Sequence, residues 1–147
     1  MLSFFIFLNV LKCYNIYKIG GLWMSYTNKQ IGNAALGTAI GYFTNEGYTV
    51  SIPLNDTQDY DLVVDIEGKL HRVQVKGTTF KTKYNVYQVS LKSSGGTKGK
   101  IYKTIKETNV DLIFVACEDG LMYLIPKEVL KNSSTLNLGK EYSEYRL

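Results

Sequence analysis

The spacing of hydrophobic and polar residues predicts one helix followed by a series of strands. Thr27 and Gln30 form a capping-box pattern, which predicts that a helix over 28–46 begins here and ends at a glycine. Gly37 and Gly41 lie one turn apart on a face outside the apolar arc, where we expect close approach to a sheet or a partner. The apolar positions fall within about half of the helix circumference: Ile31, Ala35, Leu36, Ala39, Ile40 and Phe43.

After this helix the pattern changes to the short period of strands. We expect strands at 48–52, 60–66, 70–76, 84–91, 110–117 and 121–125. Hairpin connections with glycine are expected at 67–69 and 118–120. Helices are expected at 100–108 and, after Pro126, at 126–130, whereas the tail from Lys131 is polar and weakly patterned. One sheet covered by helices is the natural α/β architecture for this order.

The composition is that of one basic globular domain. A chain of 147 residues has room for one adequate core, and 45% hydrophobic residues exclude wholesale disorder. The net charge is +4, and no acidic residue precedes Glu46. This balance is compatible with a polyanionic partner.

The first 23 residues differ in character from the rest. Leu2–Leu11 is strongly apolar but far shorter than the roughly 20 residues that span a bilayer, so we expect no membrane partner. We interpret 1–23 as an apolar extension, upstream of a true start at Met24, and 24–147 as the domain. The alternative is that 1–23 forms an interfacial anchor or an oligomerisation helix.

The two cysteines, Cys13 and Cys117, are too few for a zinc site. A disulfide is not expected, because Cys117 falls in a buried strand. This cysteine usage is typical of a reduced, cytoplasmic protein.

The candidate chemistry lies between Tyr60 and Lys76. Because strand side chains alternate, Gln74 and Lys76 share one face, and an antiparallel hairpin can bring Asp61 beside them. Such a polar set is costly to desolvate without purpose. His71, the only histidine, points to the opposite face and is read as structural or exposed.

These three residues suit hydrolysis of a phosphodiester. Asp61 can supply a hard oxygen ligand for Mg²⁺, Gln74 can add its amide oxygen, and Lys76 can orient the attacking water and offset developing charge. The alternative is an ordinary strand pair with an exposed polar face, and alternation alone does not decide between the two.

The spacing Asp61…Gln74-Val75-Lys76 resembles the signature of the PD-(D/E)XK nucleases, with glutamine at the second acidic position. The ordered segments KQIGNAALGTAI, GYTVSIPLND, YDLVV, RVQVKGT and VSLKSSGG resemble the subgroup that contains cyanobacterial group I intron-encoded homing endonucleases. The resemblance implies a restriction-endonuclease-like αβββαβ core with a mixed central sheet flanked by helices. It also implies a DNA endonuclease that uses Mg²⁺, or Mn²⁺ as a substitute, and acts on double-stranded DNA as a homodimer or homotetramer.

By the same resemblance, Asp61, Gln74 and Lys76 are the catalytic residues, and the carbonyl of Val75 joins Asp61 and Gln74 as a metal ligand. Residues 90–96 fall where the family contacts the DNA backbone. The predicted DNA-binding residues are Lys81, Lys83, Ser93, Ser94, Lys98 and Lys100. The alternative for the lysines is an ordinary solvated surface.

One residue departs from the family pattern. The first helix of the family often supplies a glutamate to the metal site, and this sequence has Asn33 there. With Asp61 as the sole certain carboxylate, Mg²⁺ should bind weakly unless DNA phosphates complete its shell. Asp56, Asp59 and Asp65 are candidate substitutes.

The leading interpretation is therefore a Mg²⁺-dependent DNA endonuclease of homing or other mobile-element origin. The first alternative is an inactive DNA-binding module derived from such a nuclease, and the second is a junction resolvase or defence nuclease.

Overall fold

A computed structural model describes residues 26–55, 57–95, 101–132 and 134–147. Helix α2, Asn28–Asn45, begins with the predicted capping box. The backbone N–H of Gln30 donates to Oγ1 of Thr27 at 3.3 Å, and the N–H of Thr27 donates to Oε1 of Gln30 at 2.9 Å. The helix ends at Asn45, Glu46 is its C-cap, and Gly47 follows with a φ of 82° that suits glycine.

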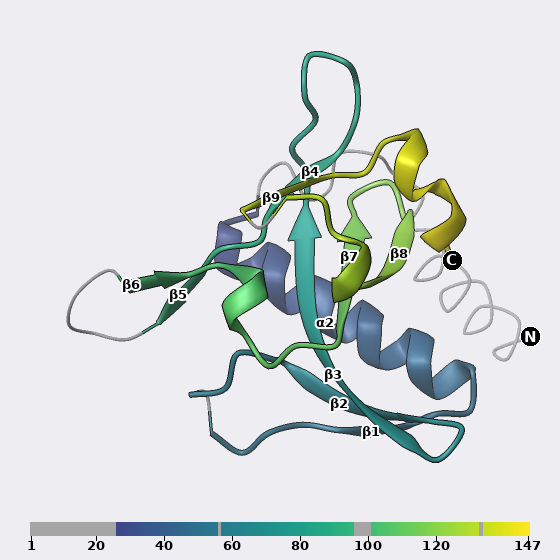
Figure 1. The fold of residues 1–147 in the computed structure, drawn as a ribbon. Helices are drawn as coiled ribbons and strands as arrows, with labels where there is room; N and C mark the ends of the chain where they lie inside the picture. Colours follow the sequence, from purple (N-terminus) through teal and green to yellow (C-terminus); the bar gives the residue numbers. More distant parts are fainter. Residues whose placement is uncertain (1–25, 56, 96–100, 133) are drawn as a thin grey trace, which may run out of the picture.

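The central sheet has five strands in the order β1-β2-β3-β7-β8 (Figure 1). Their bounds are β1 Thr49–Ser51, β2 Leu62–Ile66, β3 Lys69–Thr78, β7 Leu112–Cys117 and β8 Met122–Pro126. Only β3 and β7 pair in parallel, so the sheet is mixed, as predicted. Glu67 and Gly68, with φ of 53° and 81°, form the tight turn between β2 and β3.

Each face of this sheet has its own core. On one face α2 packs with a cluster that includes Phe43, Leu62, Val73 and Phe114. The opposite face is covered by the two-stranded sheet of β4, Gln88–Ser90, and β9, Thr135–Asn137, together with short 3-10 turns. That cluster includes Leu91, Ile113, Ile125 and Leu136. Figure 1 shows α2 behind β3, with β4 and β9 beyond its end.

Two expected elements differ in the structure. The strand expected at 84–91 is wrong for most of its length, since only β4 forms, because Asn85 turns the chain at φ 58°. The helix expected at 100–108 is also wrong over its described part. There β6, Ile101–Lys103, pairs with β5, Ser93–Gly95, and η3, Ile105–Glu107, follows as a single 3-10 turn.

The tail from Lys131 is more ordered than its pattern indicated. It forms β9 and the 3-10 helix η5, Lys140–Tyr145, and buries three side chains in the core: Leu136, Leu138 and Tyr142. Before it, η4, Lys127–Val129, is the short helix expected after Pro126. Too few apolar residues at regular spacing mark the tail, so periodicity could not reveal it.

Of the two explanations offered for Gly37 and Gly41, close approach to a sheet is wrong for both glycines, and close approach to a partner stays a prediction. A Cβ at Gly37 or Gly41 would meet no atom within 4 Å, so neither marks a close approach within the chain. A Cβ at Gly77 would lie 2.8 Å from both Cγ2 and the carbonyl oxygen of Ile31. Gly77 therefore lets α2 rest directly on β3, next to the candidate site.

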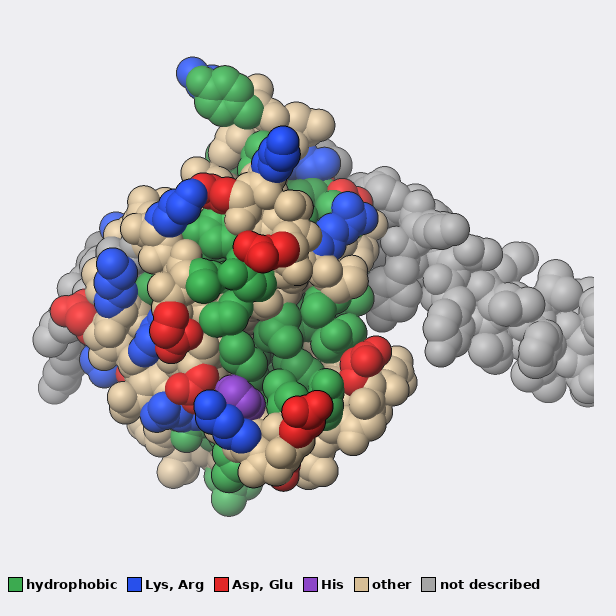
Figure 2. Space-filling view, turned by 45° about the vertical axis from the view of Figure 1, so that its right-hand side comes forward, with side chains coloured by type: hydrophobic (Ala, Val, Ile, Leu, Met, Phe, Trp, Pro, Cys, Tyr) green, Lys and Arg blue, Asp and Glu red, His purple; other side chains and the backbone are tan. Residues whose placement is uncertain are grey.

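On the surface, apolar side chains gather in the middle of one face, and charged side chains surround them (Figure 2). The histidine borders this area, and the register places His71 opposite Val64, on the face away from Gln74, as predicted. Among the described residues no helix could cross a membrane. Cys117 is buried with its thiol free, and the extension 1–23 lies outside the described residues.

Candidate active site

The predicted hairpin brings Asp61 against the middle of β3. The backbone N–H of Asp61 donates to the carbonyl of Val73 at 2.9 Å. In return, the backbone N–H of Val75 donates to Oδ2 of Asp61 at 2.6 Å. The carboxylate thus occupies a position that a further β2 residue would otherwise pair with.

The register explains why this edge is open. Pairing of β2 with β3 ends at Leu62 and Val73, so Val75 has no strand partner on that side. The N–H and C=O groups of one strand residue point to the same neighbour. The carbonyl of Val75 therefore faces the same edge as its N–H, beside Asp61.

Gln74 and Lys76 lie on the face of β3 that points away from α2. Val73 packs in the α2 cluster and Gly77 contacts Ile31, so alternation turns Gln74 and Lys76 to the other face. Arg72 lies on this same face and pairs with Val63, so Val63 points to it too. Asp61 lies two residues before Val63 and by alternation shares that face, as predicted. The structure thus brings together Asp61, Gln74 and Lys76.

The side chain of Gln74 is held in one orientation with its oxygen unpaired. Gln74 is 5% exposed, and its Nε2 donates to the carbonyl of Asp59 at 3.2 Å. Its Oε1 is buried and has no hydrogen-bond partner among the described residues. A buried amide oxygen without a partner is costly, and it marks a place where a ligand or ion would be favourable.

The charges of Asp61 and Lys76 are both disfavoured by their surroundings. Loss of solvation raises the pKa of Asp61, and the Val75 N–H and the charge of Lys76 oppose this in part. Burial lowers the pKa of Lys76, against the attraction of Asp61. Opposite shifts of two neighbouring groups are typical of functional sites.

An open pocket of about 200 Å³ lies beside Asp61 and reaches α2. Its lining residues are Leu36, Pro53, Asn55, Gln58, Tyr60 and Asp61. Asn33 is exposed and lies one turn before Leu36 on α2. Because α2 covers the face opposite Gln74 and Lys76, residue 33 can reach the site only past the open edge of β3.

The model of the PD-(D/E)XK endonucleases matches residues 26–144, a span that contains all three site residues.

This chain belongs to the PD-(D/E)XK endonuclease family.

The relatives agree with this membership. Protein 5.3 of Escherichia phage T7 is 30% identical over 122 residues, which cover 81% of this chain and 98% of that protein. The bacterial homing endonuclease I-Ssp6803I has a similar structure, with a TM-score of 0.68 and 26% identity. That match covers 82% of this chain and 88% of the other. These matches confirm the restriction-endonuclease-like fold and the predicted resemblance to the PD-(D/E)XK nucleases. They also support the assignment of the chain as a DNA endonuclease.

PD-(D/E)XK nucleases typically use divalent metal ions, and the residues present fit such an ion in kind. The unpaired Oε1 of Gln74, the carboxylate of Asp61 and the carbonyl of Val75 are all hard oxygen donors, which Mg²⁺ and Mn²⁺ prefer. The negative charge of this ligand set is low, because Asp61 is its one carboxylate. Within the described ranges, no three His, Cys, Asp or Glu side chains group into a metal site.

The other candidate carboxylates do not add to this set. The carboxylate of Asp59 is paired with Nζ of Lys103 at 3.4 Å. Asp65 belongs to β2, where it pairs with Leu70, and lies four residues after Asp61, which is roughly 13 Å in extended chain. Asp56 lies outside the described residues.

The predicted DNA-binding residues lie in two segments. Lys81 is paired with Asp119 at 3.9 Å and lies over the ring of Tyr87, while Lys83 is exposed beside Tyr84. Ser93 and Ser94 belong to β5, and Lys98 and Lys100 lie outside the described residues.

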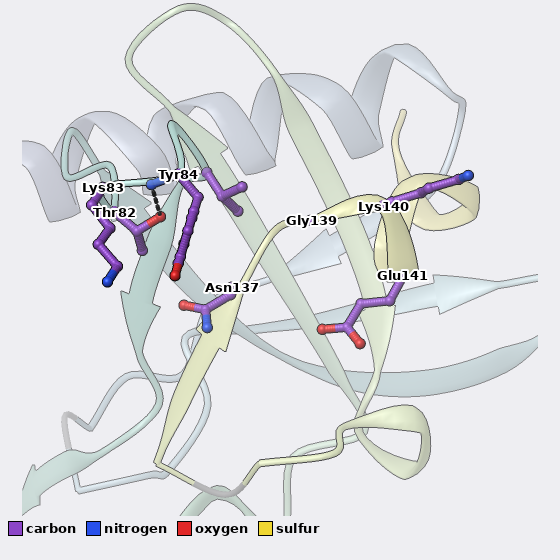
Figure 3. A pocket seen from close by; sticks show the side chains of 8 residues that line it. Thr82, Lys83, Tyr84, Asn137, Gly139, Lys140 and Glu141 are labelled. Atoms are coloured by element: carbon purple, nitrogen blue, oxygen red, sulfur yellow. Dashed lines mark hydrogen bonds between the residues drawn. The ribbon is translucent and has the colours of Figure 1, made fainter.

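The turn that carries Lys83 borders a cleft of about 490 Å³ (Figure 3). Tyr84 lies on one side of the cleft, and Lys140 and Glu141 of η5 lie on the other. Tyr84 is 76% exposed, and its N–H donates to Oγ1 of Thr82 at 3.3 Å. The cleft shares no lining residue with the pocket at Asp61, so it is a separate surface feature.

Two polar partnerships escaped the sequence analysis. Arg72 makes a bidentate ion pair with Asp111, which also accepts the Arg72 backbone N–H at 2.8 Å and so fixes the start of β7 beside β3. Asp59 connects Gln74 to Lys103 of β6. Partners separated by 39 and 44 residues leave no local pattern, so only a spatial structure could reveal them.

Proposed function

We propose that this protein is a metal-dependent DNA endonuclease that hydrolyses phosphodiester bonds of double-stranded DNA. The observation that carries the proposal is the buried, unpaired Oε1 of Gln74 beside the oriented carboxylate of Asp61. An apolar residue would fill position 74 at lower cost if the strand were merely structural. Family membership supports the same reading.

In this proposal Asp61, Gln74 and the carbonyl of Val75 hold the divalent ion. Mg²⁺, or Mn²⁺ in its place, would polarise a phosphoryl oxygen and lower the pKa of a bound water. The chain contributes only one carboxylate to this set, so DNA phosphate oxygens are needed to complete the ligand shell. Metal affinity should therefore be low in the absence of DNA.

Lys76 acts on the water and on the phosphate. Its ammonium group orients the attacking water, whose oxygen forms a bond to phosphorus as the bond to the leaving deoxyribose oxygen breaks. The proton that the attacking water loses passes to solvent, and the leaving oxygen takes up a proton from another water molecule. The positive charge offsets the negative charge that develops on the phosphorane. Partial burial strengthens this interaction because less water screens it.

DNA reaches the site across two basic segments, the turn at Lys81 and Lys83 and the hairpin of β5 and β6. Lysine contacts to phosphate would make binding strongly dependent on salt. We also propose a homing or other mobile-element role, and a homodimer or homotetramer, since one small domain covers only a short site. The cytoplasmic location suggested by the cysteines stays a prediction.

The test is cleavage of supercoiled plasmid by the full chain with Mg²⁺ or Mn²⁺. The parent should nick or linearise the plasmid, and Lys76→Ala should reduce this by about 100-fold or more. Lys69→Ala is the matched control, because Lys69 is exposed at the start of the same strand and should have no effect. Equal cutting by the parent and Lys76→Ala would disprove the assignment.

A second candidate function is an inactive DNA-binding module, which the presence of Asn33 and a single site carboxylate favours. Salt-sensitive DNA binding without cleavage of any substrate would support it. A junction resolvase or defence nuclease would instead cut branched or unspecific DNA in preference to one long duplex site.

A further inference from the structure

Asp59 contacts both Gln74 of the candidate site and Lys103 of β6. Its backbone carbonyl accepts the hydrogen bond from Nε2 of Gln74 at 3.2 Å. Its carboxylate accepts from Nζ of Lys103 at 3.4 Å. The residue lies two positions before Asp61, in the segment that leads into β2.

The first contact decides which end of the Gln74 amide faces the site. A glutamine amide has a donor end and an acceptor end of nearly the same shape. Were the amide turned over, Oε1 would face the carbonyl of Asp59, two acceptors would meet, and the buried NH₂ group would face the place of a cation. The Asp59 carbonyl therefore selects the orientation in which Oε1 points to the site.

The second contact holds Asp59 in place. The Asp59 side chain is 20% exposed and that of Lys103 is 52% exposed. Lys103 belongs to β6, which pairs with β5 through Ser93, a predicted DNA contact. The ion pair thus connects the segment before Asp61 to the β5–β6 hairpin, which we propose contacts DNA.

We infer that Asp59 is a positioning residue for the metal site. Its backbone carbonyl orients the Gln74 amide, and the ion pair between its carboxylate and Lys103 keeps that carbonyl in place. The inference rests on the proposed function. It implies that DNA binding at the β5–β6 hairpin and the geometry of the metal ligands are linked through one exposed ion pair, which salt should weaken.

The first test uses the protein without metal or DNA. In nuclear magnetic resonance spectra the side-chain amide of Gln74, assigned by its loss in Gln74→Met, should exchange its hydrogens slowly. Asp59→Asn and Lys103→Met should each speed this exchange and shift the resonance. The charge-reversed double variant Asp59→Lys with Lys103→Asp should restore both towards the parent. Unchanged exchange in both single variants would overturn the inference.

The second test titrates Mn²⁺ into each full-length variant with an uncleavable phosphorothioate duplex present. Removing the direct partner of a metal ligand typically costs about 10- to 100-fold in metal affinity, so the less direct change here should cost about 3- to 10-fold. Lys131→Met is the matched control, since it breaks an exposed Lys–Glu pair elsewhere on the surface and should change nothing.

The outcomes separate the two proposals. Weaker DNA binding in Lys103→Met with unchanged Mn²⁺ affinity and unchanged Gln74 exchange would make Lys103 a DNA contact only, and would overturn the positioning role. If the parent binds no Mn²⁺ and cuts no DNA, the proposed function fails. The amide exchange of Gln74 then decides by itself whether Asp59 orients it.

Discussion

The backbone N–H of Val75 donates to Oδ2 of Asp61 at 2.6 Å, in place of a β2 residue that would continue the sheet. The bond fixes a carboxylate at an open strand edge, where its second oxygen and the Val75 carbonyl can face one ion. It also explains why β2 begins at Leu62, because the Val75 N–H bonds to the Asp61 side chain and not to a backbone carbonyl of a longer β2.

Asp61→Asn should keep the fold and remove the function. The raised pKa means that the folded state holds the Asp61 proton more tightly than the unfolded state does. This group's contribution to stability is therefore greatest below 3.8 and declines as pH rises through the folded pKa. Asparagine keeps the oxygen that accepts from Val75 without the charge.

Urea unfolding of the metal-free protein at pH 7 should thus find Asp61→Asn at least as stable as the parent, while Mn²⁺ affinity on uncleavable DNA falls by about 10-fold or more. A clear loss of stability would contradict the dominance of desolvation at Asp61. Asp65→Asn, in the adjoining strand β2, is the comparison.

Lys76→Met should gain stability as it loses activity. Burial lowers the pKa of Lys76, so its charged form weakens the fold at all pH values below the folded pKa. This penalty disappears as pH rises from the folded pKa towards 10.5. Removing the charge should raise the free energy of unfolding at pH 7 by about 1 kcal/mol, a trade typical of active sites.

Thermal and urea unfolding at pH 7 and pH 9.5 would measure this. The gain of Lys76→Met over the parent should be smaller at the higher pH, whereas Lys69→Met should differ little from the parent at both. A destabilised Lys76→Met would mean that the electrostatic attraction between Lys76 and Asp61 outweighs the cost of burial.

The sequence predicted the parts of this site that depend on local pattern. Alternation placed Gln74 and Lys76 on one face, and the short turn at Glu67-Gly68 brought Asp61 to them. It could not predict that the Asp59 carbonyl accepts from the Gln74 amide, because a backbone carbonyl carries no residue-specific signal. The same limit applies to β9 and η5, which are held by scattered apolar anchors such as Leu136.

Gln74→Glu tests whether position 74 holds a cation. A glutamate there would place negative charge on a 5% exposed side chain, facing the Asp59 carbonyl that now accepts from Nε2. Without metal the variant should therefore be less stable than the parent, by about 1–3 kcal/mol.

Saturating Mn²⁺ with uncleavable DNA should restore much of that loss in Gln74→Glu, and its metal affinity should exceed that of the parent. Gln74→Met, which can bind no hard cation, is the control and should show no such rescue. Absence of rescue in Gln74→Glu would argue against a cation at this position.

Asn33→Glu asks whether the missing family carboxylate can be restored. Residue 33 is exposed one turn before Leu36, which lines the pocket beside Asp61. A glutamate reaching past the open edge of β3 would add charge to the metal site and raise Mn²⁺ affinity by about 10-fold. Asn45→Glu, exposed at the far end of α2, should leave it unchanged. Equal effects of the two variants would indicate a general charge effect and not a ligand.

Gly77→Ala should separate the position of α2 from the chemistry of the site. The new Cβ would lie 2.8 Å from Cγ2 and the carbonyl oxygen of Ile31 and 3.0 Å from Cβ of Ala35, and the backbone oxygen of a helix cannot simply turn away. We expect a loss of about 1–3 kcal/mol in the free energy of unfolding, as in other overpacked cores. Because α2 must shift where it crosses β3, cleavage should fall by more than the folded fraction does. Gly37→Ala is the control, since its new Cβ meets no atom within 4 Å. It should leave cleavage unchanged and leave the free energy of unfolding unchanged or higher. A stable and fully active Gly77→Ala would show that the contact between Ile31 and β3 does not set the geometry around Lys76.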